Sequence, residues 1–484
     1  MIDLDNFILD ESKTIYDALQ VLQKNERGIL FITESHKVVG VATDGDLRRS
    51  LLRGLSLESN IKDAMNSKFT ALPVSASDSL IRASFKPTLR LIPLCDDEGN
   101  LVDLADAQKS HRIPLLEPDL TGDELQYVVD CMESNWISSQ GSYVRRFEKQ
   151  FEEMHGGTHA LAVSNGTVAL HLAFHSLGIG KGDEVIVPDI TFAATINAVL
   201  YCNATPVLCE IDSETLCIDA GEAEKLISNR TKAIVPVHLY GQPCDMDAMR
   251  YLAQKYNLLV IEDCAEAIGS SWKDQPVGLF GDAATFSFFG NKTISTGEGG
   301  MILFKDREVF EHAKILRDHG MNPSLKYWHD HVGFNYRLTN IQAAIGVAQM
   351  ERREEIFLNK LRIAALYTKI LEGAPGISKL QPIIPGTINS SWLYTVLLER
   401  NINRNNIITE LLKYGIESRP IFYPLHMMPP YKKFSKSKSL KNSITVSGCG
   451  ISLPSSIRMN DEEVIYAAQC LEEVISNTQD NCSD

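Results

Sequence analysis

The first hundred residues alternate between helical and strand-like spacing of hydrophobic positions. Apolar residues recur at helical spacing in TIYDALQVLQKN, residues 14–25. Two short β-rich runs follow, GILFIT and VVGVAT, and DGDLRRSLLRG then opens another helix near Asp46. This order predicts a unit of helix, strand, strand and helix.

A weaker copy of this unit comes next. We expect SASDSLIRASF, residues 75–85, to form its helix, and LRLIPLCDDEGNLVDLAD, residues 89–106, to form two strands around an Asp-Glu-Gly turn. Two similar units of this size predict an internal repeat. HRIPLLE contains a proline and precedes a new pattern, so we place a domain boundary near residue 110.

The remaining residues, 111–484, alternate helical patterns with apolar runs of strand length. The runs are EVIVPDI, PVLCEID, KAIVPVHLY, LLVIEDC, AATFSFF and GMILF. Alternation of this kind favours an α/β fold with a mainly parallel sheet.

Length and charge narrow the class of protein. The 484 residues are too many for one ordinary hydrophobic core, so two or three domains are expected. The net charge of −15 repels nucleic acid and anionic membranes, and we expect neither as a partner. The sequence shows neither an export signal nor an uncharged run of membrane-spanning length, which predicts a cytoplasmic protein.

Cysteine and histidine spacing favours structural roles. Ten cysteines without a CxxC pair indicate buried thiols in a cytoplasmic chain. His171 and His175 would share a helix face at a spacing that suits a metal, but no HExxH glutamate or third ligand is evident. We therefore expect no metal site.

A first candidate site lies at a strand-to-helix turn, AVSNGTVAL. Gly166 and Thr167 at the helix start offer backbone N–H groups, a hydroxyl and the positive end of the helix dipole, which together suit a phosphate. An ordinary capped turn explains the same residues, and by itself this segment favours that alternative.

A second candidate is Asp263, which follows the apolar strand LLVIE. Ligands of open α/β sheets gather at the carboxyl ends of the strands, where a carboxylate can pair with a protonated ring nitrogen. For pyridoxal phosphate that pairing makes the ring a better acceptor of electrons from the reacting carbon.

The third candidate is Lys292, in GDAATFSFFGNKTISTGEGG. A lysine in such a site can bond to an aldehyde and move protons as a general base. Most lysines are solvated surface residues, but the neighbours of this one change that expectation. Ser287 can donate to a phosphate, and the glycines at 297, 299 and 300 permit tight backbone passage.

Together these motifs identify a resemblance. SNGT, EDCAEAIG, GDAATFSFFGNKTISTGEGGM and GFNYRLTNIQAAIG, in that order, resemble the DegT/DnrJ/EryC1/StrS sugar aminotransferase family, over residues 113–475. The resemblance implies a fold type I aminotransferase that uses pyridoxal 5′-phosphate, with a large domain of about 111–360, a small C-terminal α/β domain of about 361–484, and a homodimer whose active sites lie between subunits. A related branch that removes a hydroxyl carries histidine in place of Lys292, so the lysine argues for transamination.

The resemblance also implies the cofactor site. Lys292 would be the catalytic lysine that bonds the cofactor, Asp263 would pair with its ring nitrogen, and Phe192 would stack on the ring, although a buried core position explains Phe192 equally well. Glu266 stands where many relatives have Gln. The implied cofactor-binding residues are Gly166, Thr167, Phe192, Asp263, Glu266, Ser287, Lys292 and, from the neighbouring chain, Asn335.

The implied reaction moves an amine from L-glutamate, by way of pyridoxamine phosphate, to C4 of a nucleotide-linked 4-keto-6-deoxy sugar. Through segments such as WISSQGSYVRRFE and RPIFYPLHMMPPY, the resemblance implies GDP-4-keto-6-deoxy-D-mannose as the substrate and GDP-perosamine, for surface polysaccharide such as O-antigen, as the product. Alternatives are a UDP- or dTDP-linked sugar, and a nucleotide sensor that keeps the fold only as a scaffold. Implied substrate contacts, each of which could instead pack or cap, are Trp136, Ser138, Ser139, Trp328, His329, Tyr423 and His426.

The N-terminal repeat resembles a pair of CBS domains, residues 1–110, through the segment GVATDGDLRR. In that family a Thr and an Asp here often hold a ribose, which implies a regulatory nucleotide at Thr43 and Asp46. Capping of the following helix by Thr43 or Asp44 is as good an explanation. The second copy lacks a matching Thr-Asp segment.

Overall fold

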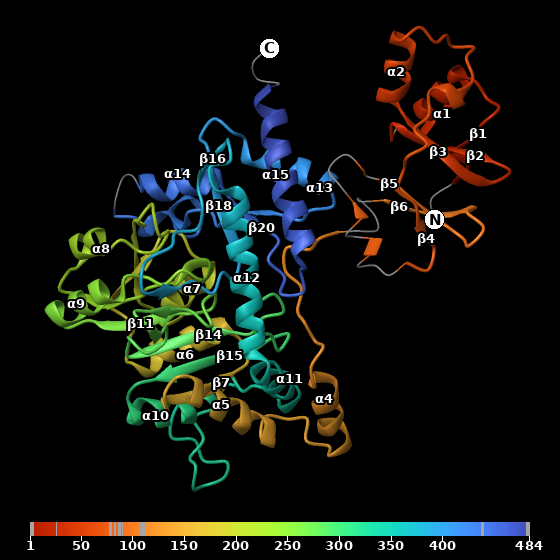
Figure 1. Ribbon diagram of the computed structural model, residues 1–484. Coiled ribbons are helices and arrows are strands. Elements are labelled where there is room, and N and C mark those ends of the chain that lie inside the picture. The colour runs from red at the N-terminus through yellow and green to blue at the C-terminus, as the bar shows by residue number, and fades with distance from the viewer. Residues whose placement is uncertain are drawn as a thin grey trace. The chain divides into compact units, whose positions relative to one another are not determined.

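The chain folds into two compact units (Figure 1). In the computed structural model, residues 4–25, 27–76, 80–81, 84–85, 89, 91–106, 112–436 and 440–480 are described. The first unit comprises residues 1–113, 409–417 and 469–473, and the second comprises 114–408, 418–468 and 474–484. The domain limits near residues 110 and 360 stay predictions.

The first half of the N-terminal unit has the predicted helix, strand, strand and helix. A short helix and strand precede them, and β1 pairs parallel with β2, which pairs antiparallel with β3. The buried face of α1, including Ile15 and Leu22, packs against Leu30 and Ile32 of β2. The elements are η1 (Leu4–Asn6), β1 (Ile8–Asp10), α1 (Ile15–Asn25), β2 (Ile29–Glu34), β3 (Lys37–Thr43) and α2 (Asp44–Leu52).

The second half repeats the strand pairing of the first. After η2 (Ile61–Asp63), β4 (Leu72–Pro73) runs parallel to β5 (Leu91–Cys95), and β5 is antiparallel to β6 (Leu101–Asp106). The predicted turn between β5 and β6 is present, with Gly99 at φ +88°. The same pairing order in both halves is what an internal repeat requires. The helix predicted over 75–85 lies partly outside the described residues.

A seven-stranded sheet forms the centre of the second unit, in the order β7-β15-β14-β11-β10-β8-β9. Only β15 runs in the direction opposite to the other six strands of this sheet, which confirms the mainly parallel arrangement expected from the sequence. The strands are β7 (His159–Val163), β8 (Glu184–Pro188), β9 (Thr205–Cys209), β10 (Thr231–Ile234), β11 (Leu259–Asp263), β14 (Ala283–Ser287) and β15 (Gly300–Phe304).

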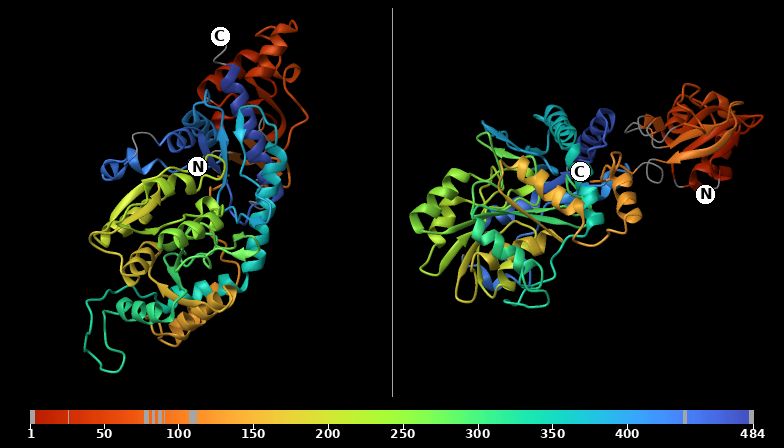
Figure 2. Two further views of the ribbon diagram at one scale, coloured as in Figure 1. Left: turned by 90° about the vertical axis from the view of Figure 1, so that its left-hand side faces the viewer. Right: turned by 90° about the horizontal axis from the view of Figure 1, so that it is seen from below.

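Helices lie on both sides of these strands (Figure 2). Alternate residues of β15 show why: Ile302 packs into one hydrophobic cluster, with α6 and α7, while Met301 and Leu303 pack into another, with α5 and α11. A sheet buried on both faces explains the nearly continuous apolar runs in the sequence. The helices are α4 (Glu124–Glu133), α5 (Ser142–Met154), α6 (Gly166–Ser176), α7 (Ala193–Tyr201), α8 (Ala220–Leu226), η3 (Leu239–Gly241), α9 (Met246–Tyr256), α10 (Arg307–Arg317), α11 (Asn340–Glu351) and α12 (Arg353–Leu371).

The C-terminal part adds a smaller, antiparallel sheet, in the order β16-β18-β20-β19. A separate three-stranded sheet, β13-β12-β17, also joins this region to the segment after β11. The elements are β12 (Ser271–Trp272), β13 (Gln275–Pro276), β16 (Ile377–Lys379), β17 (Thr387–Ile388), β18 (Tyr394–Leu398), α13 (Arg404–Lys413), β19 (Arg419–Pro420), η4 (Leu425–Met427), η5 (Lys432–Phe434), α14 (Lys441–Cys449), β20 (Gly450–Leu453) and α15 (Asp461–Asp480).

Two sequence expectations concern the whole chain. Nine of the ten cysteines lie in the described part of the chain, and all nine are buried free thiols, as expected; Cys482 lies outside it. Among the described residues, every helix is too short or too polar to cross a bilayer.

Candidate active site

A cavity of about 560 Å³ opens at the carboxyl ends of the central strands. The turn after β7, the end of β11 and the segment after β14 all contribute to it, as expected for a ligand site in an open α/β sheet. It brings together every predicted cofactor residue except Asn335. These are Gly166, Thr167, Phe192, Asp263, Glu266, Ser287 and Lys292.

One end of the cavity is a cradle at the start of α6. The side chain of Asn165 caps the helix by accepting the N–H of Val168 at 3.0 Å. A Cβ added to Gly166 would lie 2.9 Å from Cβ and 3.1 Å from Oγ of Ser287, so the backbone and this hydroxyl approach each other closely. Helix N–H groups and a hydroxyl facing one space suit a phosphate, which favours the functional interpretation over an ordinary capped turn.

Asp263 lies at the end of β11 with its carboxylate buried. Oδ2 accepts the hydroxyl of Thr195 at 2.7 Å, and Oδ1 accepts the backbone N–H of Ala265 at 3.1 Å. Burial raises the pKa of Asp263 above its usual value, and the hydrogen bond from Thr195 lowers it in part. A carboxylate fixed in this way is suited to receive a cationic ring nitrogen.

Lys292 extends its amine into the same cavity. Nζ lies 3.6 Å from Oε1 of Glu266 and 3.7 Å from the ring centroid of Trp392. Burial lowers the pKa of Lys292, while the charges of Glu266 and Asp263 raise it in part. A buried amine whose proton is easier to remove than in water is suited to act as a nucleophile and a base.

Aromatic rings form one wall of the cavity. The ring centroids of Phe192 and Phe422 are 5.9 Å apart, those of Phe422 and Tyr240 are 5.4 Å apart, and those of Tyr240 and Trp392 are 6.1 Å apart. The side chain of Phe192 is 61% exposed, so the alternative that it is a buried core residue is wrong. An exposed ring at the cavity mouth is available to stack on a flat ligand.

Comparison with known proteins agrees with this geometry. Residues 118–472 match the DegT/DnrJ/EryC1/StrS aminotransferase family. The chain belongs to this family. The aminotransferase is therefore an enzyme that depends on pyridoxal phosphate, and the cradle, the buried acid and the buried lysine of its cavity fit that cofactor.

Individual relatives each match about three quarters of this chain. It is 46% identical to GDP-perosamine synthase of Caulobacter vibrioides, over 75% of this chain and 98% of that protein. Identity to GDP-perosamine synthase of Escherichia coli O157:H7 is 44%, over 75% and 99%. Helicobacter pylori PseC, an aminotransferase involved in the biosynthesis of pseudoaminic acid, has a solved structure with a TM-score of 0.73 at 29% identity, over 76% of this chain and all of that one.

The N-terminal unit contains a CBS domain, which matches residues 2–53. Thr43 and Asp46 form a capping box there: Thr43 Oγ1 accepts the N–H of Asp46 at 3.2 Å, and Asp46 Oδ2 accepts the N–H of Thr43 at 3.1 Å. This cap moves the start of α2 to Asp44, two residues before the predicted start. The predicted nucleotide role of both residues stays a prediction.

The predicted substrate residues after α4 and the predicted cofactor residue Asn335, before α11, do not line the cavity of this chain. Trp136 and Ser138 follow α4, where their carbonyl oxygens accept hydrogen bonds from the side chain and backbone of Asn340, and Ser139 is partly buried beside them. Asn335 accepts from Nε of Arg337 at 3.1 Å. The substrate roles of Trp136, Ser138 and Ser139 and the cofactor role of Asn335 stay predictions.

The other predicted substrate residues also lie outside the cavity lining. Trp328 is exposed and donates to Asp330 at 3.0 Å, and the ring nitrogen of His329 lies 3.0 Å from the carbonyl of His319. Tyr423 is exposed, close to Arg404. His426 Nδ1 lies 2.6 Å from Oδ2 of the buried Asp189. Their substrate roles stay predictions.

Three residues at the cavity are absent from the sequence-based prediction. Thr195 holds Asp263, the backbone N–H of Tyr240 holds Glu266 at 2.9 Å, and Trp392 covers Lys292. Tyr240 has φ +53°, which is uncommon for a tyrosine, and the segment HLYGQP gives no local sign of it. Trp392 lies a hundred residues from Lys292, so only the tertiary fold reveals their contact.

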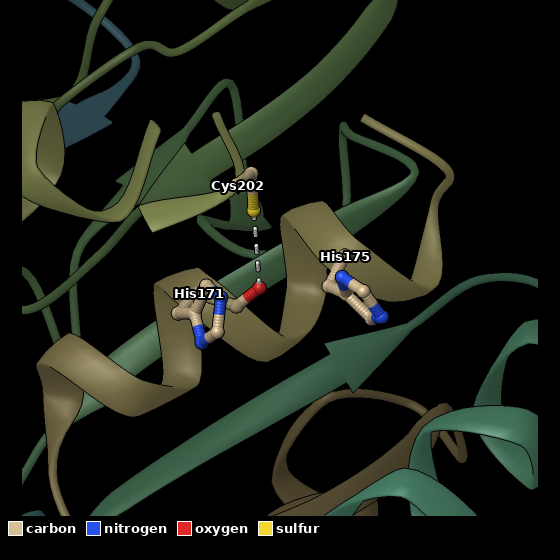
Figure 3. Close-up of side chains that lie close together, drawn as sticks. All are labelled: His171, His175 and Cys202. Carbon is tan, nitrogen blue, oxygen red and sulfur yellow. Dashed lines mark hydrogen bonds between the residues drawn. The ribbon is translucent and has the colours of Figure 1, made fainter. Parts of the chain in front are cut away.

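His171, His175 and Cys202 come together on α6 and the end of α7, with one donor atom of each within 4.8 Å of the others. Figure 3 shows the thiol directed at the carbonyl oxygen of His171, 3.9 Å away, rather than at either imidazole ring. His171 Nδ1 lies 2.9 Å from the hydroxyl of Tyr336. Burial raises the pKa of Cys202 to about 12 and lowers that of His171 to about 4. We assign these residues to packing.

Proposed function

We propose that this aminotransferase moves an amino group from L-glutamate to C4 of GDP-4-keto-6-deoxy-D-mannose and so forms GDP-perosamine. The relatives named GDP-perosamine synthase support this substrate, since this chain covers nearly their whole length. The observation that carries the chemistry is the buried amine of Lys292, in one cavity with two buried carboxylates. The same intact site argues against a non-catalytic scaffold.

The cavity residues divide into holding and reacting groups. Gly166, Thr167 and Ser287 would hold the phosphate of the cofactor, Asp263 its ring nitrogen, and Phe192 the face of its ring. Pyridoxal phosphate supplies a carbonyl group that carries the amine between substrates and a ring that accepts electrons from the reacting carbon.

Lys292 would move the proton in both halves of the reaction. Its Nζ is the only amine among the described lining residues, and burial lowers its pKa, which makes its proton easier to remove. Tyr240 and Trp392 shield this amine from water on one side. Alternation between an amino donor and a keto acceptor at one amine predicts ping-pong kinetics.

A homodimer with shared active sites is part of the proposal. Apolar side chains are exposed on α4 and on the loop before α11, which an isolated soluble chain rarely shows in such numbers. They are Leu125, Met132, Trp136, Leu325, Tyr327, Trp328 and Val332. A second copy seated on them would allow Asn335, Trp328 and His329 to reach the neighbouring cavity, in keeping with their absence from the lining of their own.

We also propose a cytoplasmic enzyme whose CBS unit responds to a nucleotide. The CBS match over residues 2–53 supports the second point. Adenine and guanine nucleotides would raise the melting temperature or change turnover if they bind the folded unit. If no nucleotide changed the melting temperature or the turnover, an architectural role would be the better account of the unit.

The substrate is tested by supplying the purified enzyme with L-glutamate and GDP-, UDP- and dTDP-linked 4-keto-6-deoxy sugars, with products identified by mass spectrometry. We expect the GDP sugar to give a 4-amino product at least tenfold faster than the others. Lys292→Ala should abolish the product and the visible absorbance of the bound cofactor, whereas Lys314→Ala, at an exposed lysine of α10, should keep both. Equal turnover of a UDP or dTDP sugar would contradict the proposed substrate.

A further inference from the structure

Among the described residues, Glu266 is the one carboxyl group within 4 Å of the amine of Lys292. Burial raises the pKa of Glu266, and the charge of Lys292 lowers it in part, which favours the ionised pair. Its two oxygens have different partners: Oε2 accepts the backbone N–H of Tyr240 at 2.9 Å, and Oε1 lies 3.6 Å from Lys292 Nζ. The carboxylate is therefore anchored at one oxygen and turned toward the lysine with the other.

The anchor of Glu266 is rigid. Tyr240 has left-handed backbone angles, φ +53° and ψ +21°, which a tyrosine adopts only when its surroundings hold it there. Its ring is stacked between Trp392 and Phe422, and its hydroxyl accepts the backbone N–H of Phe422 at 2.9 Å. Since the aromatic wall fixes Tyr240, it also fixes the carboxylate that Tyr240 binds.

The other acid beside the lysine is engaged elsewhere. Asp263 accepts hydrogen bonds from Thr195 and Ala265 on its two oxygens. Burial lowers the pKa of Lys292, and of the two carboxylates Glu266 opposes that shift more strongly. The titratable groups of the described cavity lining are Asp263, Glu266, Glu298, Lys292, Arg419 and Tyr240.

We propose that Glu266 is a positioning residue that keeps the proton on Nζ of Lys292 and thereby sets the pH range in which this lysine works. The inference rests on the proposed function, because it concerns the lysine of that same site. A Gln at this position could accept the N–H of Tyr240 through its side-chain carbonyl equally well. It could not supply the negative charge, so the two side chains share an anchor and differ in electrostatics.

The test compares wild type with Glu266→Gln, first in the cofactor-free, full-length protein. Competitive acetylation of Lys292, followed by peptide mass spectrometry across a pH series, reports the pKa of the amine. We expect the pKa of Lys292 to fall by about one unit in Glu266→Gln, so labelling below that pKa becomes about tenfold faster. A variant that only lost structural support would have a lower melting temperature. Faster labelling of this buried lysine at an unchanged melting temperature would therefore point to the lost charge.

The cofactor-loaded protein supplies the second readout. The midpoint of the pH titration of its visible absorbance should fall in Glu266→Gln in the same direction, and so should the acid limb of the turnover profile. Glu266→Asp retains the charge, so both quantities should return at least part of the way to their wild-type values. Glu308→Gln removes an exposed carboxylate at the start of α10 and should change neither quantity.

The outcomes separate the two claims. A pKa for Lys292 in Glu266→Gln within about 0.3 unit of wild type, with an unchanged absorbance titration, would overturn the role of Glu266. Failure of the wild-type enzyme to aminate any keto sugar would overturn the proposed function, while the labelling of the cofactor-free protein would still decide the role of Glu266.

Discussion

Gly166 shows how a single residue without a side chain shapes the cavity. Its Cα faces Ser287 so closely that any Cβ would lie within 3 Å of the serine Cβ, and the space beyond belongs to the phosphate cradle at the start of α6. Its role follows from the close approach of two segments that are more than a hundred residues apart in the sequence.

Replacement of Gly166 by Ala tests this role. The added methyl group must displace Ser287 from the cradle, so we expect the dissociation constant for pyridoxal phosphate to rise about tenfold or more. Fluorescence titration of the cofactor-free protein measures it. Gly180→Ala is a matched control, because the nearest atom to a Cβ there is 3.9 Å away, and it should bind the cofactor as wild type does. If both variants bound the cofactor with equal affinity, Gly166 would have no role in the cradle.

At the scale of elements, α12 is tied to the active-site wall by a buried lysine. Nζ of Lys360 donates to the carbonyl oxygens of Trp392, at 2.7 Å, and Ser455, at 2.6 Å. These two residues lie just before β18 and just after β20, and Trp392 covers Lys292. Burial lowers the pKa of Lys360 to about 7, since the ammonium group is removed from water.

This lysine makes stability depend on pH. Between pH 7 and the ordinary lysine pKa the unfolded chain binds one more proton than the folded chain, so the free energy of unfolding rises with pH across that window and is flat below it. The slope attributable to Lys360 is at most about 1.4 kcal/mol per pH unit. Lys360→Met should lower the free energy of unfolding and remove the part of its pH dependence that comes from this lysine.

Urea unfolding of wild type and Lys360→Met at pH 7, 8 and 9 measures the effect as a difference between the two proteins. The difference in unfolding free energy should grow with pH, because only wild type gains stability. A difference that stays constant over this range would mean that the buried amine does not titrate there.

For the whole molecule, the question is whether two chains complete one site. If Asn335 serves the partner's cofactor, Lys292→Ala and Asn335→Ala are each inactive as homodimers, and a mixed dimer contains one intact site. Mixed dimers formed by unfolding and refolding both variants together should recover roughly a quarter of wild-type activity. In the control, both refolded chains carry Lys292→Ala, and this mixture should recover no activity. Absence of recovery in verified mixed dimers would contradict shared sites.

Much of this enzyme follows from the sequence. Local patterns predicted the first half of the N-terminal unit, the two longer strands of its second half and six of the seven strands of the central sheet, because burial on one or both faces of a strand leaves a direct record in the spacing of apolar residues. Motif order placed Lys292, Asp263 and the glycine turn at one sheet edge, since the carboxyl ends of parallel strands converge there.

Only the tertiary structure decided what surrounds those groups. The contact of Trp392 with Lys292, the bond from Thr195 to Asp263 and the backbone donor of Tyr240 for Glu266 join segments that no local pattern connects. The sequence by itself determined that a lysine, an aspartate, a glutamate and a glycine turn meet in one cavity. The fold decided their charge and orientation, because burial, distance and hydrogen bonding are properties of segments brought together from far apart in the chain.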